Sequence, residues 1–170
     1  MANTYVLIST VTVGSGGSAT ITFASIPATY TDLILKLSVR NTSTSGADNL
    51  IKLNSITSGY TDSYAQADGT TTGTGSNVST TRLLAGVNNL SNSTANIFTS
   101  VDIYIPDYAG SNNKIANSES AHENNAQTAT LTMEVALSSN SAAITDIELT
   151  TSANSFAEFS SASLYGISNT

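Results

Sequence analysis

Alternation of apolar and polar residues is the strongest pattern in the chain. In the segment 32–40, three leucines and a valine, from Leu33 to Val39, fill every second position, and Lys36, Ser38 and Arg40 lie on the alternate positions. A period of two residues is typical of a half-buried β-strand, because successive side chains point to opposite faces of a sheet. The segment therefore predicts a strand with its aliphatic face buried and with Lys36, Ser38 and Arg40 on the opposite, solvent-facing side.

Two more segments, 96–105 and 128–138, show the same alternation. In the first, isoleucine and valine share one face, and Asp102 and Tyr104 lie on the other. The second segment has an apolar set, Ala129, Leu131, Met133, Val135 and Leu137, that alternates with Thr130, Thr132, Glu134 and Ala136. We expect the apolar set of each strand to face the core.

Weaker strand signals fill much of the rest of the chain. They are β-branched segments bounded by turn residues, at 5–13, 19–23, 50–53, 81–85, 114–121, 144–150 and 158–167. About ten short strands without helical periodicity predict an all-β protein, an antiparallel β-sandwich with jelly-roll-like connectivity. No linker or repeat divides residues 1–170, so the sequence predicts a single domain.

The segment 54–80 interrupts this pattern. It is rich in glycine and threonine and poor in aliphatic residues. We expect a long polar loop here. Because structureless segments of this length are uncommon inside compact domains, the loop is expected to be functional or to become ordered against a neighbouring chain.

Composition excludes several classes of protein. The chain contains 27 Ser, 26 Thr and 17 Asn, no Cys, and a net charge of −7. The acidic balance argues against nucleic-acid binding, and the lack of cysteine excludes a disulfide scaffold. The first residues have no basic region, and polar residues interrupt their apolar run, so the sequence predicts neither a secretory signal nor a membrane span.

Candidate chemistry is sparse. His122 is the one histidine, which disfavours a zinc site or a Ser-His-Asp triad, and we expect it at a turn or strand end. The twelve acidic residues are scattered, with Asp102 and Glu134 on strands, and they suggest no glycosidase pair. Calcium bound by loop oxygens stays open as an alternative. The sequence therefore predicts no catalytic, cofactor-binding or metal-binding residues, and no enzyme.

Tyrosines near the two expected loops are the best candidates for a binding surface. Tyr60, Tyr64 and Tyr108 lie in or beside the segments 54–80 and 107–113. Tyrosine is enriched in protein interfaces, so these residues are candidate partner contacts. Two alternatives remain: a platform for sugar stacking, or ordinary packing of the loops and sheets.

Several phrases of the sequence are similar to a family of small virion proteins of tailed, often marine, bacteriophages. They are YVLISTVTVG, ATITFASIPATYTDLILK, VDIYIPDYAGSNNK, SNSAAITDIELT and SASLYGI, which together span residues 5–167 but leave out 54–80. Such proteins are β-sandwich components of the particle, either capsid decoration (cement) proteins or domains of tail fibres. The family offers no catalytic motif to transfer to this chain.

The resemblance implies a location and partners more than a mechanism. We expect a non-enzymatic decoration protein that is made in the host cytoplasm and stabilises the capsid surface. Its expected partners are the major capsid protein and copies of itself, as a homotrimer, without nucleic acid, membrane or cofactor. The alternative is a tail-fibre or receptor-binding module that recognises a host surface glycan. An enzyme acting on glycans is the remaining alternative.

Overall fold

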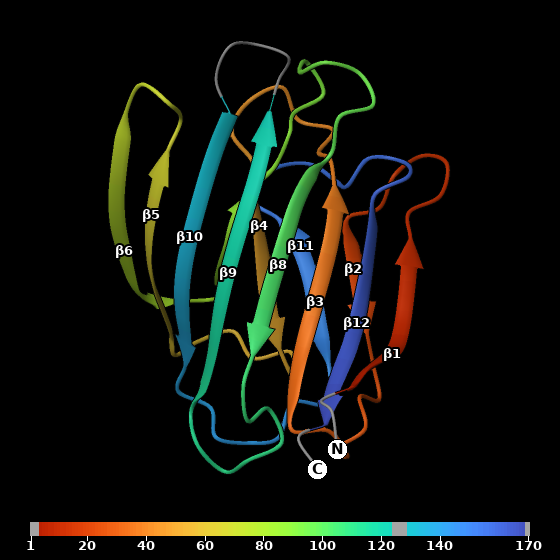
Figure 1. Ribbon diagram of the computed structural model, residues 1–170, viewed down its shortest axis with the longest axis vertical. Coiled ribbons are helices and arrows are strands. Elements are labelled where there is room, and N and C mark those ends of the chain that lie inside the picture. The colour runs from red at the N-terminus through yellow and green to blue at the C-terminus, as the bar shows by residue number, and fades with distance from the viewer. Residues whose placement is uncertain (1–3, 124–128, 169–170) are drawn as a thin grey trace.

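The computed structural model describes residues 4–123 and 129–168, which form two antiparallel β-sheets packed face to face (Figure 1). The large sheet has the strand order β1 (Thr4–Thr12), β12 (Ser161–Ser168), β3 (Asp32–Val39), β8 (Thr99–Ile105), β9 (Lys114–Glu123), β10 (Ala129–Ser138), β5 (Tyr60–Ala67) and β6 (Thr72–Thr80). The small sheet has the order β2 (Thr20–Phe23), β11 (Ile147–Thr151), β4 (Asp48–Leu53) and β7 (Leu83–Val87).

The expected all-β sandwich is confirmed, and each of the ten segments predicted as strands overlaps an observed strand. The jelly-roll connectivity stays a prediction. Within the described ranges, no helix is long and apolar enough to cross a membrane.

The segment 54–80 is not a loop, which corrects the sequence-based prediction. It contains β5 and β6, joined by a short turn in which the Asp68 carboxylate accepts hydrogen bonds from the Thr70 and Thr71 N–H groups, at 2.9 and 2.7 Å. The hairpin extends the large sheet beyond the edge of the small one (Figure 1). Because both faces of β6 are largely exposed, its residues need no apolar alternation, and the sequence carries no strand signal there.

The apolar core lies between the small sheet and the β12–β3–β8 part of the large sheet. The alternating faces predicted for 32–39 and 99–105 are confirmed, because Leu33, Leu35, Val101 and Ile103 are fully buried. The small sheet contributes the facing side chains, Ile21, Phe23, Ile51, Leu53, Ile147 and Leu149.

In β10 the buried face is the opposite of the one predicted. Thr132 and Glu134 are buried, and Leu131 and Met133 are exposed. The reason is the close approach of β7, which packs against the inner side of β9 and β10. At Gly86 of β7, a Cβ atom would lie 2.5 Å from the side chain of Ser120, so only small side chains fit between the strands. Alternation predicted the strand but not which of its faces is covered.

Two basic side chains, those of Arg40 and Lys114, are buried and hold loops in place. Arg40 is 8% exposed, which corrects the prediction that it faces solvent. Its guanidinium donates hydrogen bonds to the carbonyls of Ser91, Ser93, Thr94 and Ile97, at 2.5 to 3.2 Å. Lys114 is likewise buried, and its Nζ donates to backbone carbonyls of the loops that flank it.

Candidate functional site

The outer face of the large sheet, which is the face turned away from the small sheet, is hollowed into an open groove of about 600 Å³. We call it the central groove. Side chains of β8 and β9 form its floor, β3 forms one wall, and β10 with β5 forms the other. The outward-facing residues that line it are Ile34, Lys36, Ser63, Ala65, Asp102, Tyr104, Asn117, Glu119, Met133 and Val135.

Charged groups lie on the floor and on the β3 wall of the central groove. Lys36 Nζ and Asp102 Oδ2 are 2.7 Å apart, and both side chains are about half exposed, at 50% and 57%. Glu119 is the cross-strand neighbour of Asp102 and points to the same face. An exposed ion pair of this kind adds little stability, so these groups are available to a ligand or partner.

Tyr104 is held in place by the start of β3. Its hydroxyl donates a hydrogen bond to Asp32 Oδ2 at 2.8 Å, and the Asp107 N–H donates to Asp32 Oδ1 at 3.0 Å. Partial burial, followed by the carboxylate of Asp32, raises the pKa of Tyr104 above its usual value. The phenol therefore stays protonated, with its ring fixed beside the groove.

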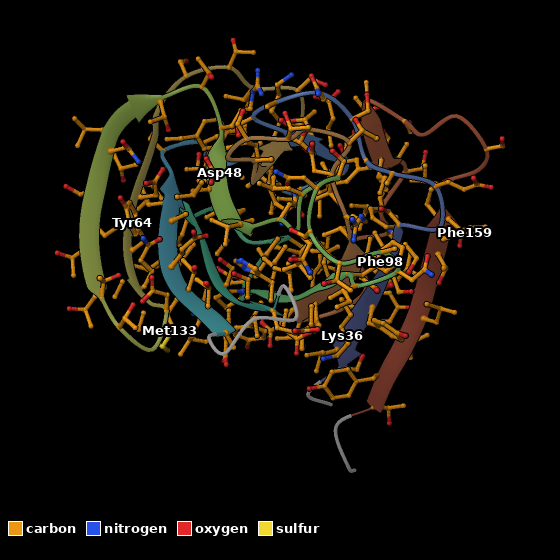
Figure 2. All side chains as sticks on the ribbon, turned by 90° about the horizontal axis from the view of Figure 1, so that it is seen from above. Lys36, Asp48, Tyr64, Phe98, Met133 and Phe159 are labelled. Atoms are coloured by element: carbon orange, nitrogen blue, oxygen red, sulfur yellow. The ribbon has the colours of Figure 1, made fainter. Side chains whose placement is uncertain are left out.

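The β10 wall of the groove is apolar. Leu131, Met133 and Val135 are 40%, 55% and 49% exposed, although large apolar side chains usually contribute to a core. Ile115 of β9 is exposed on the same face. Figure 2 shows Met133 and Lys36 on the same side of the molecule, on either side of the groove.

Behind this wall, the inner side of β9 and β10 carries a buried polar cluster. Glu134 Oε2 accepts hydrogen bonds from the Gly86 N–H at 2.7 Å and from the Ser118 hydroxyl at 2.8 Å. Burial raises the pKa of Glu134 to about 7, since it outweighs these hydrogen bonds, and repulsion from Asp48 and Asp62 acts in the same direction as burial. The carboxylate satisfies a backbone donor of β7, which is an edge strand.

Several buried polar atoms near Glu134 have no hydrogen-bond partner among the residues that the structure describes. They are Ser120 Oγ, Thr132 Oγ1, His122 Nδ1 and Glu134 Oε1. His122 lies near the end of β9, as expected, and is partly buried on the inner face. Burial lowers the pKa of His122, so the ring is neutral at physiological pH. Because Glu134 at its centre is bonded to the backbone of β7 and to Ser118, we assign the cluster a structural role.

The three tyrosines predicted as partner contacts do not form one surface. Tyr60 and Tyr108 are fully buried, which corrects the expectation that they are available at the surface. The Tyr60 hydroxyl accepts a hydrogen bond from the Leu53 N–H at 3.0 Å, and the Tyr108 hydroxyl donates to the Pro27 carbonyl. Tyr64 is partly exposed, packs over Gly75 of β6 and borders the central groove on its β5 side.

Packing was one of the alternatives that the sequence left open for these tyrosines, and it accounts for Tyr60 and Tyr108. The candidate residues that the sequence did not indicate are Asn117 and Glu119, which lie beside Tyr104 and Asp102 on the outer face. Their alternation with buried residues was visible, but no motif marks them. Their proximity arises from the pairing of β8 with β9, which are separated by a loop.

Within residues 4–123 and 129–168, no group of three or more His, Cys, Asp or Glu side chains is arranged to hold a metal ion. Comparisons of the chain with protein-family models, with curated proteins and with solved structures found no match. The outer face of the large sheet is therefore the site from which function must be argued.

Proposed function

We propose that this protein is a non-enzymatic structural component of a bacteriophage virion, a capsid decoration (cement) protein that stabilises the shell. In this proposal it is made in the host cytoplasm, lies on the capsid surface, and binds the major capsid protein and copies of itself as a homotrimer. The similarity of its sequence phrases to tailed-phage virion proteins, together with its β-sandwich fold, supports this assignment.

One observation carries the proposal. The outer face of β9 and β10 presents Ile115, Leu131, Met133 and Val135 to solvent, and the same strands bury serine, threonine and glutamate. Exposed apolar patches on soluble proteins commonly mark interaction surfaces. A protein that clamps neighbouring capsid subunits needs such a surface and needs no catalytic group.

The copy number of the chain in purified particles tests this proposal. Quantitative mass spectrometry against the major capsid protein is expected to give a ratio comparable to one. A copy number of only a few chains per particle would instead assign the chain to the tail. Absence from the particle would overturn both assignments.

Binding of the purified chain to capsid shells that lack it tests whether the outer face of β9 and β10 is the contact surface. Met133→Lys places a charge on the apolar wall and is expected to weaken binding about tenfold or more, since one disrupted central contact commonly costs over 1.4 kcal/mol. Thr22→Lys, at an exposed position of the small sheet, is the matched control and should bind normally. Equal binding by both variants would remove the outer face from the proposal.

The second candidate function is a tail-fibre or receptor-binding module for a host surface glycan. The floor of the central groove favours it, because Tyr104, Asn117 and Glu119 offer a ring and polar groups side by side. Binding of purified host polysaccharide that is lost in the variant Asn117→Ala/Glu119→Ala would support this function. Binding that survives the double substitution would exclude the groove as the glycan site.

A further inference from the structure

The exposed apolar side chains of the large sheet gather at its two lateral ends. At the β1 end, Tyr5, Leu7 and Phe159 are 57%, 54% and 69% exposed. Phe159 lies beside β1, where its N–H donates to the Val13 carbonyl at 2.9 Å, and Figure 2 shows its position at the β1 end of the molecule. We call these three residues the β1 margin.

Phe159 is held in a strained conformation. Its φ angle is +68°, in the left-handed region that bulky residues rarely adopt. Strained residues of this kind persist where the surrounding structure holds them, and they are common at functional sites. The backbone here keeps a large aromatic ring in solvent, next to an edge strand.

The opposite end of the sheet has hollows between its exposed side chains, which include Val78 of β6, 77% exposed. The outer face of β5 carries only small side chains, among them Ser63 and Ala65, between the larger side chains of β10 and β6. Two shallow hollows of about 250 and 400 Å³ lie along β5. Residues that line them include Ala65, Ala67, Thr74, Val78, Leu131, Met133 and Val135. We call this surface the β5 groove.

Charge does not oppose contact between these two surfaces. Strands β1 and β6 contain no charged residue, although the chain carries a net charge of −7. The charged residues of β5 and β10, Asp62 and Glu134, are both buried on the inner side. The two ends can therefore approach without the repulsion that the net charge would otherwise cause.

The directions of the edge strands also match. The large sheet has eight strands, all paired antiparallel, so its two edge strands β1 and β6 run in opposite directions. When β1 of one copy lies beside β6 of another copy in the same sheet orientation, the two strands are antiparallel. The backbone groups along both edges are then placed to continue the sheet.

We infer that the chain associates head to tail, with the β1 margin of one copy seated against the β5 groove and β6 edge of a second copy. Tyr5, Leu7 and Phe159 supply the protruding side chains, and the outer faces of β6 and, behind it, β5 receive them. Such a heterologous contact closes into a ring when the rotation between copies permits. The inference rests on the self-association that the proposed function includes and specifies its geometry. The purified chain is sufficient to test it, without capsid shells.

Two charged substitutions at exposed positions test both sides of this contact. Sedimentation velocity of the full chain over a range of concentrations is expected to show an oligomer. Leu7→Lys, in the β1 margin, and Ala65→Lys, in the β5 groove, should each raise the dissociation constant about tenfold or more. Ser100→Lys, on the outer face of the central strand β8, is the matched control and should associate normally.

Mixing the two variants distinguishes a head-to-tail contact from a symmetric one. The Leu7→Lys chain keeps an intact groove, and the Ala65→Lys chain keeps an intact β1 margin. The mixture should therefore form a one-to-one heterodimer, although each variant alone is monomeric. A monomeric wild-type chain, an oligomer that both variants retain, or a mixture without heterodimer would overturn the inference.

Phe159→Gly supplies a second variant whose folding is not at risk. Glycine removes the strain at positive φ, so its melting temperature should be unchanged or higher, while association weakens. Weaker association with equal or higher stability cannot arise from misfolding. A chain that stays monomeric yet still binds shells would overturn this inference and leave the proposed function intact.

Discussion

The two halves of the large sheet differ in which side chains they bury. In the β12–β3–β8 half, aliphatic residues such as Leu35 and Ile103 face the small sheet, and polar residues such as Lys36 meet solvent. In the β9–β10–β5 half, Ser120 and Glu134 face inward, and Met133 faces outward. One half is built for stability. The other half buries fewer apolar side chains and leaves apolar residues exposed on its outer face.

The most direct test of this difference is to make the same kind of substitution, leucine to alanine, once in each half. Leu35→Ala removes a fully buried side chain and is expected to lower the free energy of unfolding by about 2–5 kcal/mol. Leu131→Ala removes a side chain that is 40% exposed and should cost less than about 1 kcal/mol. Urea unfolding of both variants measures the difference. Equal losses would show that the outer face of β10 is covered in solution.

Replacing Glu134 tests the polar interior. Because its pKa is raised from 4.5 to about 7, the folded protein retains a proton that the unfolded chain releases between these values. The free energy of unfolding should therefore fall by on the order of 3 kcal/mol as the pH rises from 4.5 to beyond 7. Glu134→Gln cannot ionise, so this fall should disappear.

Unfolding measured at pH 5 and pH 8 is sufficient for that test. Glu119→Gln, on the outer face of the neighbouring strand, is the control and should keep the wild-type pH dependence. Because the lowered pKa of His122 makes stability rise with pH over the same range, the decisive quantity is the difference between the wild-type chain and Glu134→Gln. The same pH dependence in both chains would contradict the burial of an ionisable Glu134.

The smallest contrast is between two lysines. Lys114→Met leaves three backbone carbonyls without their donor and should lower the free energy of unfolding by about 1.5–3 kcal/mol. Lys36→Met breaks an exposed ion pair and should cost less than about 1 kcal/mol. Thermal melting in low and high salt checks both values, since only the Lys36 contribution should be screened.

Sequence patterns predicted the strands better than their faces. The alternation in 32–39 located both the strand and its buried side, because its polar positions carry charge. In 129–138 the alternation located the strand but not its buried side, since a sheet's inner face depends on what packs against it. The approach of β7 at Gly86 decides that question, and it is a contact between segments far apart in the chain.

Other errors have related physical causes. The hairpin of β5 and β6 was missed because an exposed edge strand needs no apolar residues. Arg40 was assigned to solvent because its position alternates with leucines, yet four loop carbonyls hold it inside. Tyr60 and Tyr108 were assigned to loops by their neighbours in the sequence, although their rings complete the core.

The placement of β12 has a consequence for how the protein forms. Strand β12 lies between β1 and β3, although it is the last strand of the described residues and they are among the first. During synthesis on the ribosome, β1 therefore cannot pair fully with β12 until the chain has been made as far as Ser168. Contacts between such distant segments make folding slow. The outer edge of β1 is therefore presented at the margin of a complete sheet only after β12 has paired with it.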